Sequence, residues 1–365
     1  MADDLIQVFI GTKAQYIKTA PLLRLMDARG IEYRLIDSGQ HAGLTTGLRA
    51  ELSVREPDVY MGGSDDVASV PAAISWSLRA LAQAWSAKEV RAKVFGGGGG
   101  ICVVHGDTPS TLVAAVLARR AGLRVAHLEA GLRSGSMLHP FPEEMIRVVV
   151  MRMAALLFAP SPEAVANLGR MGVRGRVIPL SGNTSAEALA AMEGAPMGDG
   201  PVVATMHRVE NLHRRERLRE FTDLITRIAA GRPVTLVVHP PTASVLDANG
   251  MSDKLKAAGV ELVPLQPHHR FVEMLAAAPF VVTDGGSVQE ECALLGVPTL
   301  LWRGRTERPD GVGGNVVLTN YSPQVIDAFL ADPDRYRRPP QRPDISPSQE
   351  ILEVLLSELP SSPHR

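Results

Sequence analysis

The sequence contains few of the residues that cross-link a chain or anchor it in a membrane. Two of its 365 residues are cysteines, Cys102 and Cys292, and both lie in apolar stretches. We therefore expect buried free thiols in a reducing compartment rather than disulfides. The N-terminal residues Met1–Asp4 are acidic and lack the basic region of a signal peptide. No apolar run reaches the roughly 18 residues that a membrane span needs. These absences predict a cytoplasmic protein without a membrane partner.

An excess of charge of one sign is absent as well. The 38 Lys and Arg residues nearly balance the 39 Asp and Glu residues, which leaves a formal net charge of -1. This balance argues against nucleic acid as a partner. The 10 histidines are scattered and form neither an H-E-x-x-H motif nor a cluster with cysteine. We therefore expect no metal site.

Short apolar runs alternate with longer amphipathic stretches along the whole chain. We interpret as strands Leu5–Ile10, Glu32–Asp37, Gly100–Val104, Arg124–Leu128 and Leu156–Ala159, and then Val202–Thr205, Val234–Val238, Glu261–Pro264, Phe280–Thr283 and Thr299–Trp302. Alternation of strands and helices at this spacing predicts parallel pairing through crossover helices. We therefore predict an α/β fold of two Rossmann-like doubly wound domains that face a central cleft.

Glycine-rich segments indicate where the domains meet. A linker-like run, Glu193–Gly200, leads us to place the first domain at residues 1–182 and the second at residues 183–345. A last helix within residues 346–365 is expected to pack back on the first domain. The pentaglycine run Gly96–Gly100 precedes its strand, whereas a phosphate-binding loop follows one, so we interpret the run as a connector.

Polar clusters follow the strands of the first domain, where doubly wound sheets bind their ligands. They are Gly11-Thr12-Lys13, Gln40-His41, His105-Gly106-Asp107-Thr108 and His127–Arg133, with Pro142–Arg147 at the head of a helix just downstream. We expect Asp107, Glu129 and Glu143 to converge on one crevice, where their repulsion favours a proton on one of them, as acid–base catalysis requires. The alternative is structural, with Asp107 as a helix N-cap and Glu143 as a partner of the helix dipole.

The second half carries a complementary set of residues. His207 and Arg208 follow one strand, His239 ends the next, and the turn Asp284–Ser287 follows a third. This Gly-Gly-Ser turn opens a helix whose free amides and positive end suit a diphosphate. Glu291, about two turns on, is placed to reach ribose hydroxyls, and Arg308 adds a cation. A plain tight connection with structural arginines is the alternative.

As a set, these motifs resemble the UDP-N-acetylglucosamine 2-epimerase family, which uses the two-Rossmann GT-B scaffold. The resemblance runs from Gly11 to the last helix. Its most specific segments are His105–Thr108, His127–Gly135, Pro142-Glu143-Glu144, Ser181-Gly182-Asn183-Thr184, Gln289-Glu290-Glu291 and Thr306-Glu307-Arg308-Pro309. The Pro-Glu-Glu and Glu-Ala-Gly-Leu-Arg forms are similar to the non-hydrolysing branch.

The resemblance implies interconversion of UDP-GlcNAc and UDP-ManNAc by elimination of UDP to 2-acetamidoglucal and re-addition, with no metal or redox cofactor. Asp107, Glu129, Glu143 and His207 would be catalytic. His207, Lys18, Ser287 and Arg308 would bind the diphosphate and Glu291 the ribose, so the second domain would hold UDP. Further UDP-sugar contacts are expected from Lys13, Gln40, His41, Arg133, Arg147, Arg208, His239, Gly285 and Gly286. Family members are often dimers, which implies a homodimer.

Several motif positions depart from the family pattern. Gly-Thr-Arg-Pro-Glu is here Gly11–Gln15, in which Lys13 lacks the bidentate fork of arginine, and Asp-Ser-Gly-Gly is here Asp284–Ser287. After His41, the family's Arg-Glu-Met, part of a regulatory UDP-GlcNAc site, is here Ala42-Gly43-Leu44. These departures leave open a retaining glycosyltransferase that passes the sugar of UDP-GlcNAc to a small polyol acceptor. A hydrolysing epimerase and a non-catalytic nucleotide-sugar binder are minor alternatives.

Overall fold

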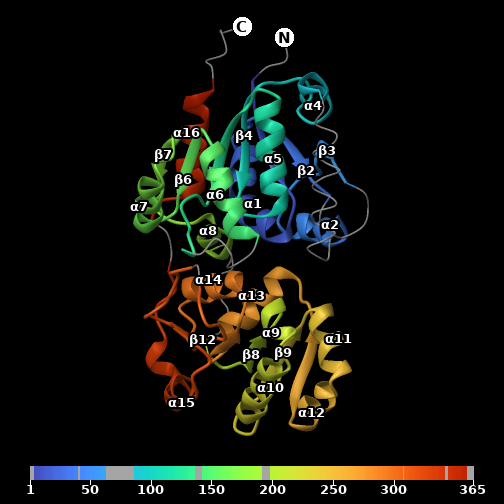
Figure 1. Cartoon of the computed structure of the whole chain (residues 1–365), viewed down its shortest axis with the longest axis vertical. Coiled ribbons are helices and arrows are strands. Elements are labelled where there is room, and N and C mark those ends of the chain that lie inside the picture. The colour runs from blue at the N-terminus through green and yellow to red at the C-terminus, as the bar shows by residue number, and fades with distance from the viewer. Residues whose placement is uncertain are drawn as a thin grey trace. The chain divides into compact units, whose positions relative to one another are not determined.

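The computed structural model describes residues 4–39, 42–62, 86–135, 142–190, 198–306, 308–341 and 344–359. The chain divides into two compact units. Unit 1 consists of Met1–Ala188 and Pro343–Arg365, and unit 2 consists of Leu189–Arg342. Each unit is built on one parallel sheet with helices between the strands (Figure 1). The predicted α/β class with two doubly wound sheets is confirmed.

Unit 1 has a seven-stranded sheet with the order β3-β2-β1-β4-β5-β6-β7. Its strands are β1 (Leu5–Ile10), β2 (Tyr33–Asp37), β3 (Val59–Tyr60), β4 (Gly100–His105), β5 (Arg124–Leu128), β6 (Leu156–Ala159) and β7 (Arg176–Pro179). Its helices are α1 (Lys13–Ala28), α2 (Ala42–Glu51), α4 (Ala87–Lys93), α5 (Pro109–Arg120), α6 (Glu143–Met153), α7 (Pro162–Met171), α8 (Thr184–Ala190) and α16 (Pro347–Glu358). The strand order reverses between β1 and β4, where a doubly wound sheet places its ligand site.

Alternate side chains of β1 pack into two separate hydrophobic cores, one on each face of the sheet. Ile6, Val8 and Ile10 of β1 are buried on one face of the sheet, and Phe9 is buried on the other with α5. The first of these cores also contains Leu352 and other apolar residues of α16, which packs against α1. The last helix therefore completes the core of unit 1, although it is far from that core in sequence.

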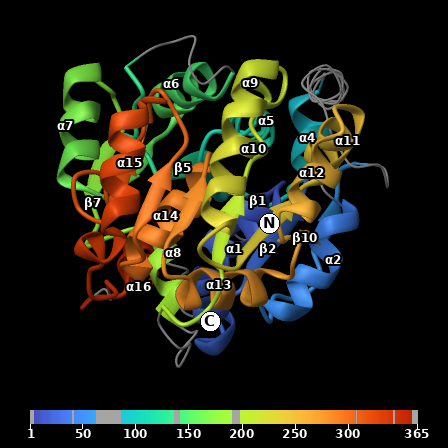
Figure 2. The ribbon, with the colours of Figure 1, turned by 90° about the horizontal axis from the view of Figure 1, so that it is seen from below.

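Unit 2 has a six-stranded sheet with the order β10-β9-β8-β11-β12-β13. Its strands are β8 (Val202–Thr205), β9 (Val234–Val238), β10 (Val260–Pro264), β11 (Val281–Thr283), β12 (Thr299–Leu301) and β13 (Val316–Leu318). Its helices are α9 (Val209–Leu212), α10 (Arg215–Ala229), α11 (Pro240–Ala248), α12 (Met251–Ala257), α13 (His268–Ala277), α14 (Gly286–Leu295), α15 (Pro323–Ala331) and the 3-10 helix η2 (Pro333–Tyr336). Helices α11 and α12 pack side by side (Figure 2).

The structure contains three strands that the sequence analysis did not list, namely β3, β7 and β13. They have two to four residues each, which is too short for an alternating pattern to stand out. Gly96 and Gly97 lie in a turn before β4, and Gly100 is the first residue of that strand, where an added Cβ atom would lie 2.3 Å from the carbonyl oxygen of Leu5. No helix in the described part of the chain is long and apolar enough to cross a membrane.

Candidate functional site

The carboxyl ends of β1, β4 and β5 meet at one edge of the unit 1 sheet, because these strands are parallel neighbours. Each strand leads into a turn with a predicted site residue: Lys13 after β1, Asp107 after β4 and Glu129 after β5. The amide of Gly106 donates a hydrogen bond of 3.2 Å to the carbonyl of Leu128, which joins the second and third turns. The topology thus brings Asp107 and Glu129 to the same edge.

Glu129 is held in an uncommon backbone conformation by buried polar contacts. Its φ of 62° lies in the left-handed region, which costs a residue with a side chain roughly 1–2 kcal/mol. Lys18 Nζ and Asn183 Nδ2 both donate to Oε1, over 2.6 and 3.0 Å. His105 Nδ1 lies 3.8 Å from Oε2, and the side chain is 6% exposed. Strained residues of this kind persist where the surrounding structure over-determines them, and they cluster at functional sites.

Arginine side chains link Asp107 to a buried glutamate that the sequence analysis did not assign. Glu144, in the first turn of α6, accepts hydrogen bonds from Arg133 Nε over 2.5 Å and from Arg147 Nη1 over 2.5 Å. It also accepts from the amide of Ser134 over 3.2 Å. Arg147 uses Nη2 to bind Asp107. The i,i+3 spacing of Glu144 and Arg147 is the signal by which this pair could have been found. Arg133 and Arg147, two of the four predicted substrate-binding arginines, therefore have protein partners.

The carboxylates at this edge are matched by cations. Arg147 forms an ion pair with Asp107, and Lys18 forms an ion pair with Glu129. These cations offset the repulsion that the sequence predicts among the carboxylates. Glu143, the third member of the predicted set, is the first residue of α6 and is half-buried, whereas its neighbour Glu144 is fully buried. The helix therefore separates the two adjacent carboxylates into different environments.

His127, at the end of β5, supports the turn that carries Asp107. Burial lowers its pKa to about 4, against the opposing effect of Asp107 and Glu129. Its Nε2 atom lies 2.7 Å from the carbonyl oxygen of Gly106. Because a carbonyl oxygen only accepts hydrogen bonds, Nε2 carries the proton of the neutral ring. The contact fixes the position of the residue that precedes Asp107.

Gln15 ties the first turn to the second. Its Oε1 atom accepts hydrogen bonds from the amides of Gly11 and Thr12 over 2.7 and 3.1 Å. Its Nε2 atom donates to the carbonyl of His105 over 2.7 Å and lies 2.9 Å from Thr111 Oγ1. The family's glutamate at this position could not donate these bonds as a carboxylate. The glutamine therefore joins the two turns through both the oxygen and the nitrogen of its amide group, while Lys13 at the start of α1 is half-buried.

In unit 2, the buried carboxylate of Asp284 shapes the turn after β8. It accepts hydrogen bonds from the amides of His207 and Arg208 over 3.0 and 3.1 Å, and from Asn211 Nδ2 over 2.9 Å. The ring of His207 packs on that of His239, with centroids 4.8 Å apart. Burial lowers the pKa of His207, although Asp284 opposes this shift. Asp284, which follows β11, thereby positions His207 and Arg208, two predicted ligand-binding residues that follow β8.

The N-terminus of α14 follows directly after Asp284. Gly285 is its N-cap, and no side chain makes a capping hydrogen bond there. A Cβ atom at Gly285 would lie 2.9 Å from Cε1 of His207, so glycine allows the ring to approach the helix start. Gly286 is half-buried and Ser287 is exposed. Predicted residues from β8 and from the α14 turn therefore come together at this point.

Three consecutive residues of α14 make side-chain contacts, two of them with Arg308. Gln289 Nε2 donates to the carbonyls of Arg308 and Asp310, each over 3.0 Å. Glu290, which is buried, accepts from Arg308 Nη1 over 2.7 Å. Glu291 Oε1 lies 3.1 Å from Nε2 of His268. The helix thus holds Arg308 in place and presents Glu291 beside a histidine.

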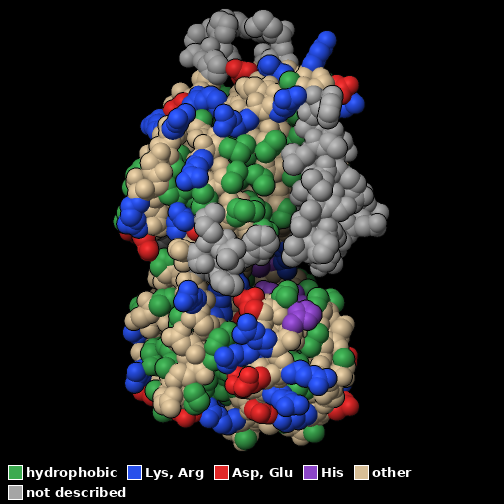
Figure 3. Space-filling view, in the orientation of Figure 1, with side chains coloured by type: hydrophobic (Ala, Val, Ile, Leu, Met, Phe, Trp, Pro, Cys, Tyr) green, Lys and Arg blue, Asp and Glu red, His purple; other side chains and the backbone are tan. Residues whose placement is uncertain are grey.

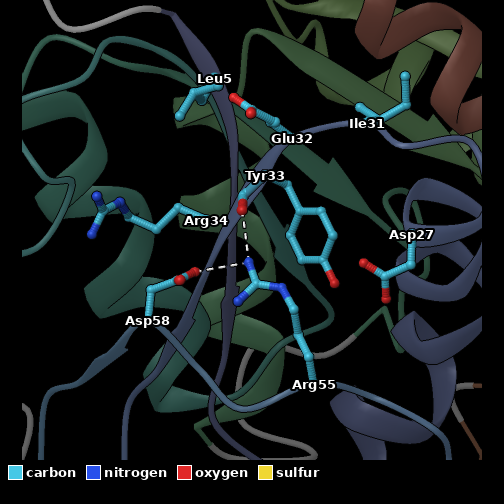
Figure 4. Close-up of a pocket in the computed structure, with 8 residues that line it drawn as sticks. All are labelled: Leu5, Asp27, Ile31, Glu32, Tyr33, Arg34, Arg55 and Asp58. Carbon is cyan, nitrogen blue, oxygen red and sulfur yellow. Dashed lines mark hydrogen bonds and ion pairs between the residues drawn. The ribbon is translucent and has the colours of Figure 1, made fainter.

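Two predicted binding residues, Gln40 and His41, lie outside the described residues, as does Glu307 of the Thr306–Pro309 segment. Within the described ranges, no group of His, Cys, Asp and Glu side chains could hold a metal ion. A surface pocket of about 320 Å³ lies in unit 1 beside the first residues of β1 and β2. It is lined by Leu5, Asp27, Ile31, Glu32, Tyr33, Arg34, Arg55 and Asp58 (Figure 4). This pocket lies at the amino ends of the strands and contains none of the predicted site residues.

These features define the class of the protein: an α/β enzyme of Rossmann-like units with polar and charged side chains at the carboxyl ends of the strands. The family model for UDP-N-acetylglucosamine 2-epimerase matches residues 24–342, and the chain belongs to this family.

Individual relatives agree with this assignment. The chain is 29% identical to the UDP-N-acetylglucosamine 2-epimerase of Bacillus subtilis, over 96% of this chain and 94% of that protein. It is 27% identical to the UDP-2,3-diacetamido-2,3-dideoxy-D-glucuronate 2-epimerase of Pseudomonas aeruginosa, over 88% of this chain and 90% of that protein. The crystal structure of Methanocaldococcus jannaschii UDP-GlcNAc 2-epimerase in complex with UDP-GlcNAc and UDP matches with a TM-score of 0.80 at 26% identity, covering 96% of this chain and 99% of that one. The predicted family is confirmed, and the comparisons support the epimerase prediction over the glycosyltransferase alternative.

Proposed function

We propose that this protein interconverts UDP-GlcNAc and UDP-ManNAc by eliminating UDP and adding it back. Membership of the epimerase family is the observation that carries this proposal. The pairing of Asp107 with Arg147 and of Glu129 with Lys18, at one edge of the unit 1 sheet, supports it. Carboxylates held by fixed cations are suited to proton transfer at a defined position.

The reaction requires no change in oxidation state overall. A carboxylate takes the proton from C2 of the sugar, and the electrons of the C2–H bond form the C1–C2 double bond. The C1–O bond breaks, and its electrons go to the phosphate oxygen of UDP. Re-addition returns UDP to C1 and a proton to C2 from the opposite face, which inverts C2. We assign the proton transfers to Asp107, Glu129 and Glu143.

Unit 2 is proposed to hold the leaving UDP. The uncapped start of α14 offers backbone amides to a diphosphate, with Ser287 and Arg308 as further donors. The lowered pKa of His207 favours a neutral ring at pH 7, which donates one hydrogen bond to a phosphate oxygen without adding a charge. Glu291, beside His268, is proposed to bind the ribose. The remaining predicted contacts are Lys13, Lys18, Gln40, His41, Arg133, Arg147, Arg208, His239, Gly285 and Gly286.

The test is incubation with UDP-GlcNAc in deuterated water, followed by NMR. We expect UDP-ManNAc to form and deuterium to appear at C2 in both epimers, without an added acceptor and with or without EDTA. Release of UDP only when a small polyol is present would instead establish the glycosyltransferase alternative. If deuterium entered C2 of UDP-2,3-diacetamido-2,3-dideoxy-D-glucuronate but not C2 of UDP-GlcNAc, the proposed type of reaction would stand and the proposed substrate would be wrong.

A homodimer through unit 1 belongs to the same proposal. Met145 and Val149, four residues apart on α6, are 42% and 38% exposed, and hydrophobic side chains gather on one face of unit 1 (Figure 3). Burying such a face against a second copy removes apolar surface from water. Sedimentation analysis should show a dimer that the pair Met145→Glu and Val149→Glu dissociates. Leu356→Glu, at an exposed position on α16, should leave the dimer intact.

The proposal includes a cytoplasmic location. Cys102 and Cys292 are free and buried, and they lie in the cores of different units. Free thiols of this kind suit a reducing compartment. Fractionation of the source cells is the direct test, and recovery of the enzyme outside the cytoplasm would contradict the proposed location.

A further inference from the structure

The motif Ser181-Gly182-Asn183-Thr184 has no part in the mechanism as described so far. It follows β7 and leads into α8, where the chain passes from unit 1 into unit 2 between Ala188 and Leu189. Asn183 is nevertheless in direct contact with a predicted catalytic carboxylate, because its Nδ2 atom donates to Glu129 Oε1 over 3.0 Å. The two residues are 54 positions apart in sequence.

Asn183 shares its acceptor atom with Lys18, whose Nζ lies 2.6 Å from the same Oε1. Two donors on one oxygen fix the rotation of the carboxylate about its last side-chain bond. The other oxygen, Oε2, then faces the Gly106 turn, where a Cβ atom at Gly106 would lie 3.6 Å from it. The backbone of Glu129 is in the left-handed region, so contacts at the end of the side chain help to hold the whole residue in place.

The segment around Asn183 is itself fixed to α16. The amide and the Oγ of Ser181 donate to Glu350 Oε2 over 2.9 and 2.8 Å. Glu187, one turn into α8, accepts from the amide of Ser348 over 3.0 Å. Asn183 thus projects from a segment that is held on both sides, which allows its amide group to hold Glu129 in turn.

We propose that Asn183 is a positioning residue for Glu129, which sets the orientation in which that carboxylate exchanges a proton with C2 of the sugar. This inference rests on the proposed epimerase function. It gives the Ser181–Thr184 motif a chemical task, since the segment that joins the two units also orients a carboxylate of the reaction.

A structural role of Asn183 can be separated from the positioning role. Its Oδ1 atom accepts from the amide of Ser185 over 3.4 Å, as a residue at a helix start does. Asn183→Asp keeps an acceptor for this amide but replaces the Nδ2 donor with an oxygen next to the Glu129 carboxylate. Asn183→Ala removes both interactions. Arg176→Ala removes an ion pair with Glu358 on the strand before this segment, leaves residues 181–184 unchanged and serves as the matched control.

The experiment measures kcat, KM, the pH profile of kcat and C2 deuterium exchange for these variants, with UDP affinity as a check of folding. We expect kcat to fall by about 10- to 100-fold in Asn183→Asp and Asn183→Ala, with little change in UDP affinity. In Asn183→Asp the acid limb of the profile should move to higher pH, because a second carboxylate beside Glu129 favours its protonated form. Arg176→Ala should keep the wild-type profile.

A near-wild-type kcat and an unchanged pH profile in Asn183→Asp would overturn the inference and leave Asn183 as a helix cap. The same conclusion would follow if Asn183→Ala alone were impaired. If Asn183→Asp does not fold, an Asn183→Ala enzyme with wild-type kcat has the same meaning. Absence of C2 exchange in the wild-type enzyme is a different result, since it would overturn the proposed function together with this inference.

Discussion

Asp107 forms an ion pair with Arg147, and Glu129 forms one with Lys18. Replacing either carboxylate by an amide therefore has two effects. It removes the group that exchanges a proton, and it leaves Arg147 or Lys18 beside a neutral partner. The second effect threatens folding because both cations are buried and an uncompensated buried charge costs roughly 3–5 kcal/mol, although Arg147 keeps Glu144 as a partner. Activity and stability therefore have to be measured on the same variants.

Asp107→Asn, Glu129→Gln and Glu143→Gln are expected to reduce kcat by about 10²- to 10⁴-fold each, the usual contribution of a general acid or base. UDP binding, measured by calorimetry, should persist in every variant that folds. Glu163→Gln is the matched control, because Glu163 is an exposed first-turn carboxylate on α7. Variants that turn over as fast as the control would show that the three carboxylates are structural partners of helices and cations.

The position of Glu143 and Glu144 in the motif did not predict which of the two side chains would be buried. Glu144 is fully buried between Arg133 and Arg147, whereas Glu143 is half-buried. The sequence places both in the first turn of a helix, but the phase of the helix against its neighbours decides which one faces inward. The contact between Asn183 and Glu129 was hidden for a similar reason, since it depends on the packing of segments that are distant in sequence.

The turns after β8 and β11 form one structural element, built around Asp284 and Gly285. Asp284 binds the backbone of the first turn, and Gly285 leaves room for the ring of His207. The backbone of Gly285, with φ −81° and ψ 128°, suits any residue. Space beside His207, rather than backbone conformation, is therefore what favours glycine at this position.

Gly285→Ala is expected to displace His207 and reduce kcat/KM by on the order of 10-fold or more, with a change in unfolding free energy within about 1 kcal/mol. The reason is the 2.9 Å approach of the added Cβ to Cε1 of His207, which requires the ring to move from its place on His239. Gly231→Ala, where an added Cβ meets no atom within 4 Å, is the control. Equal kinetics of the two variants would mean that the position of His207 does not matter for turnover.

Strands and their order along the chain were the most predictable elements. All ten strand patterns identified from the sequence correspond to observed strands, because buried parallel strands are continuous apolar runs of branched residues. The strand β3, with two residues, is too short to carry this signal, and it is defined by its pairing with β2. The placement of Asp107 and Glu129 in neighbouring turns was predictable as well, since parallel strands bring their carboxyl ends to one edge of the sheet. The cations that each carboxylate would bind were not.

The stability of the whole molecule should depend on pH through His127. Its pKa is about 4 in the folded protein and about 6.5 in the unfolded chain, because the folded protein buries the ring. Between these values the unfolded state binds the extra proton, so the free energy of unfolding rises with pH in this window and falls as the pH drops from 6.5 to 4. The expected loss from this residue is about 3 kcal/mol, and it levels off below pH 4, where both states are protonated. His207, whose pKa is also lowered by burial, adds a loss of the same sign.

Denaturant unfolding of the wild-type protein and of His127→Gln, at a series of pH values from 4 to 7, measures this effect. Glutamine does not titrate, and its amide can still donate to the carbonyl of Gly106, so the variant should keep the turn. We expect the variant's free energy of unfolding to fall less steeply between pH 6.5 and 4, by up to about 1.4 kcal/mol per pH unit. Parallel curves for the two proteins would show that His127 takes up its proton without unfolding the site, and that the turn before Asp107 tolerates a charged ring.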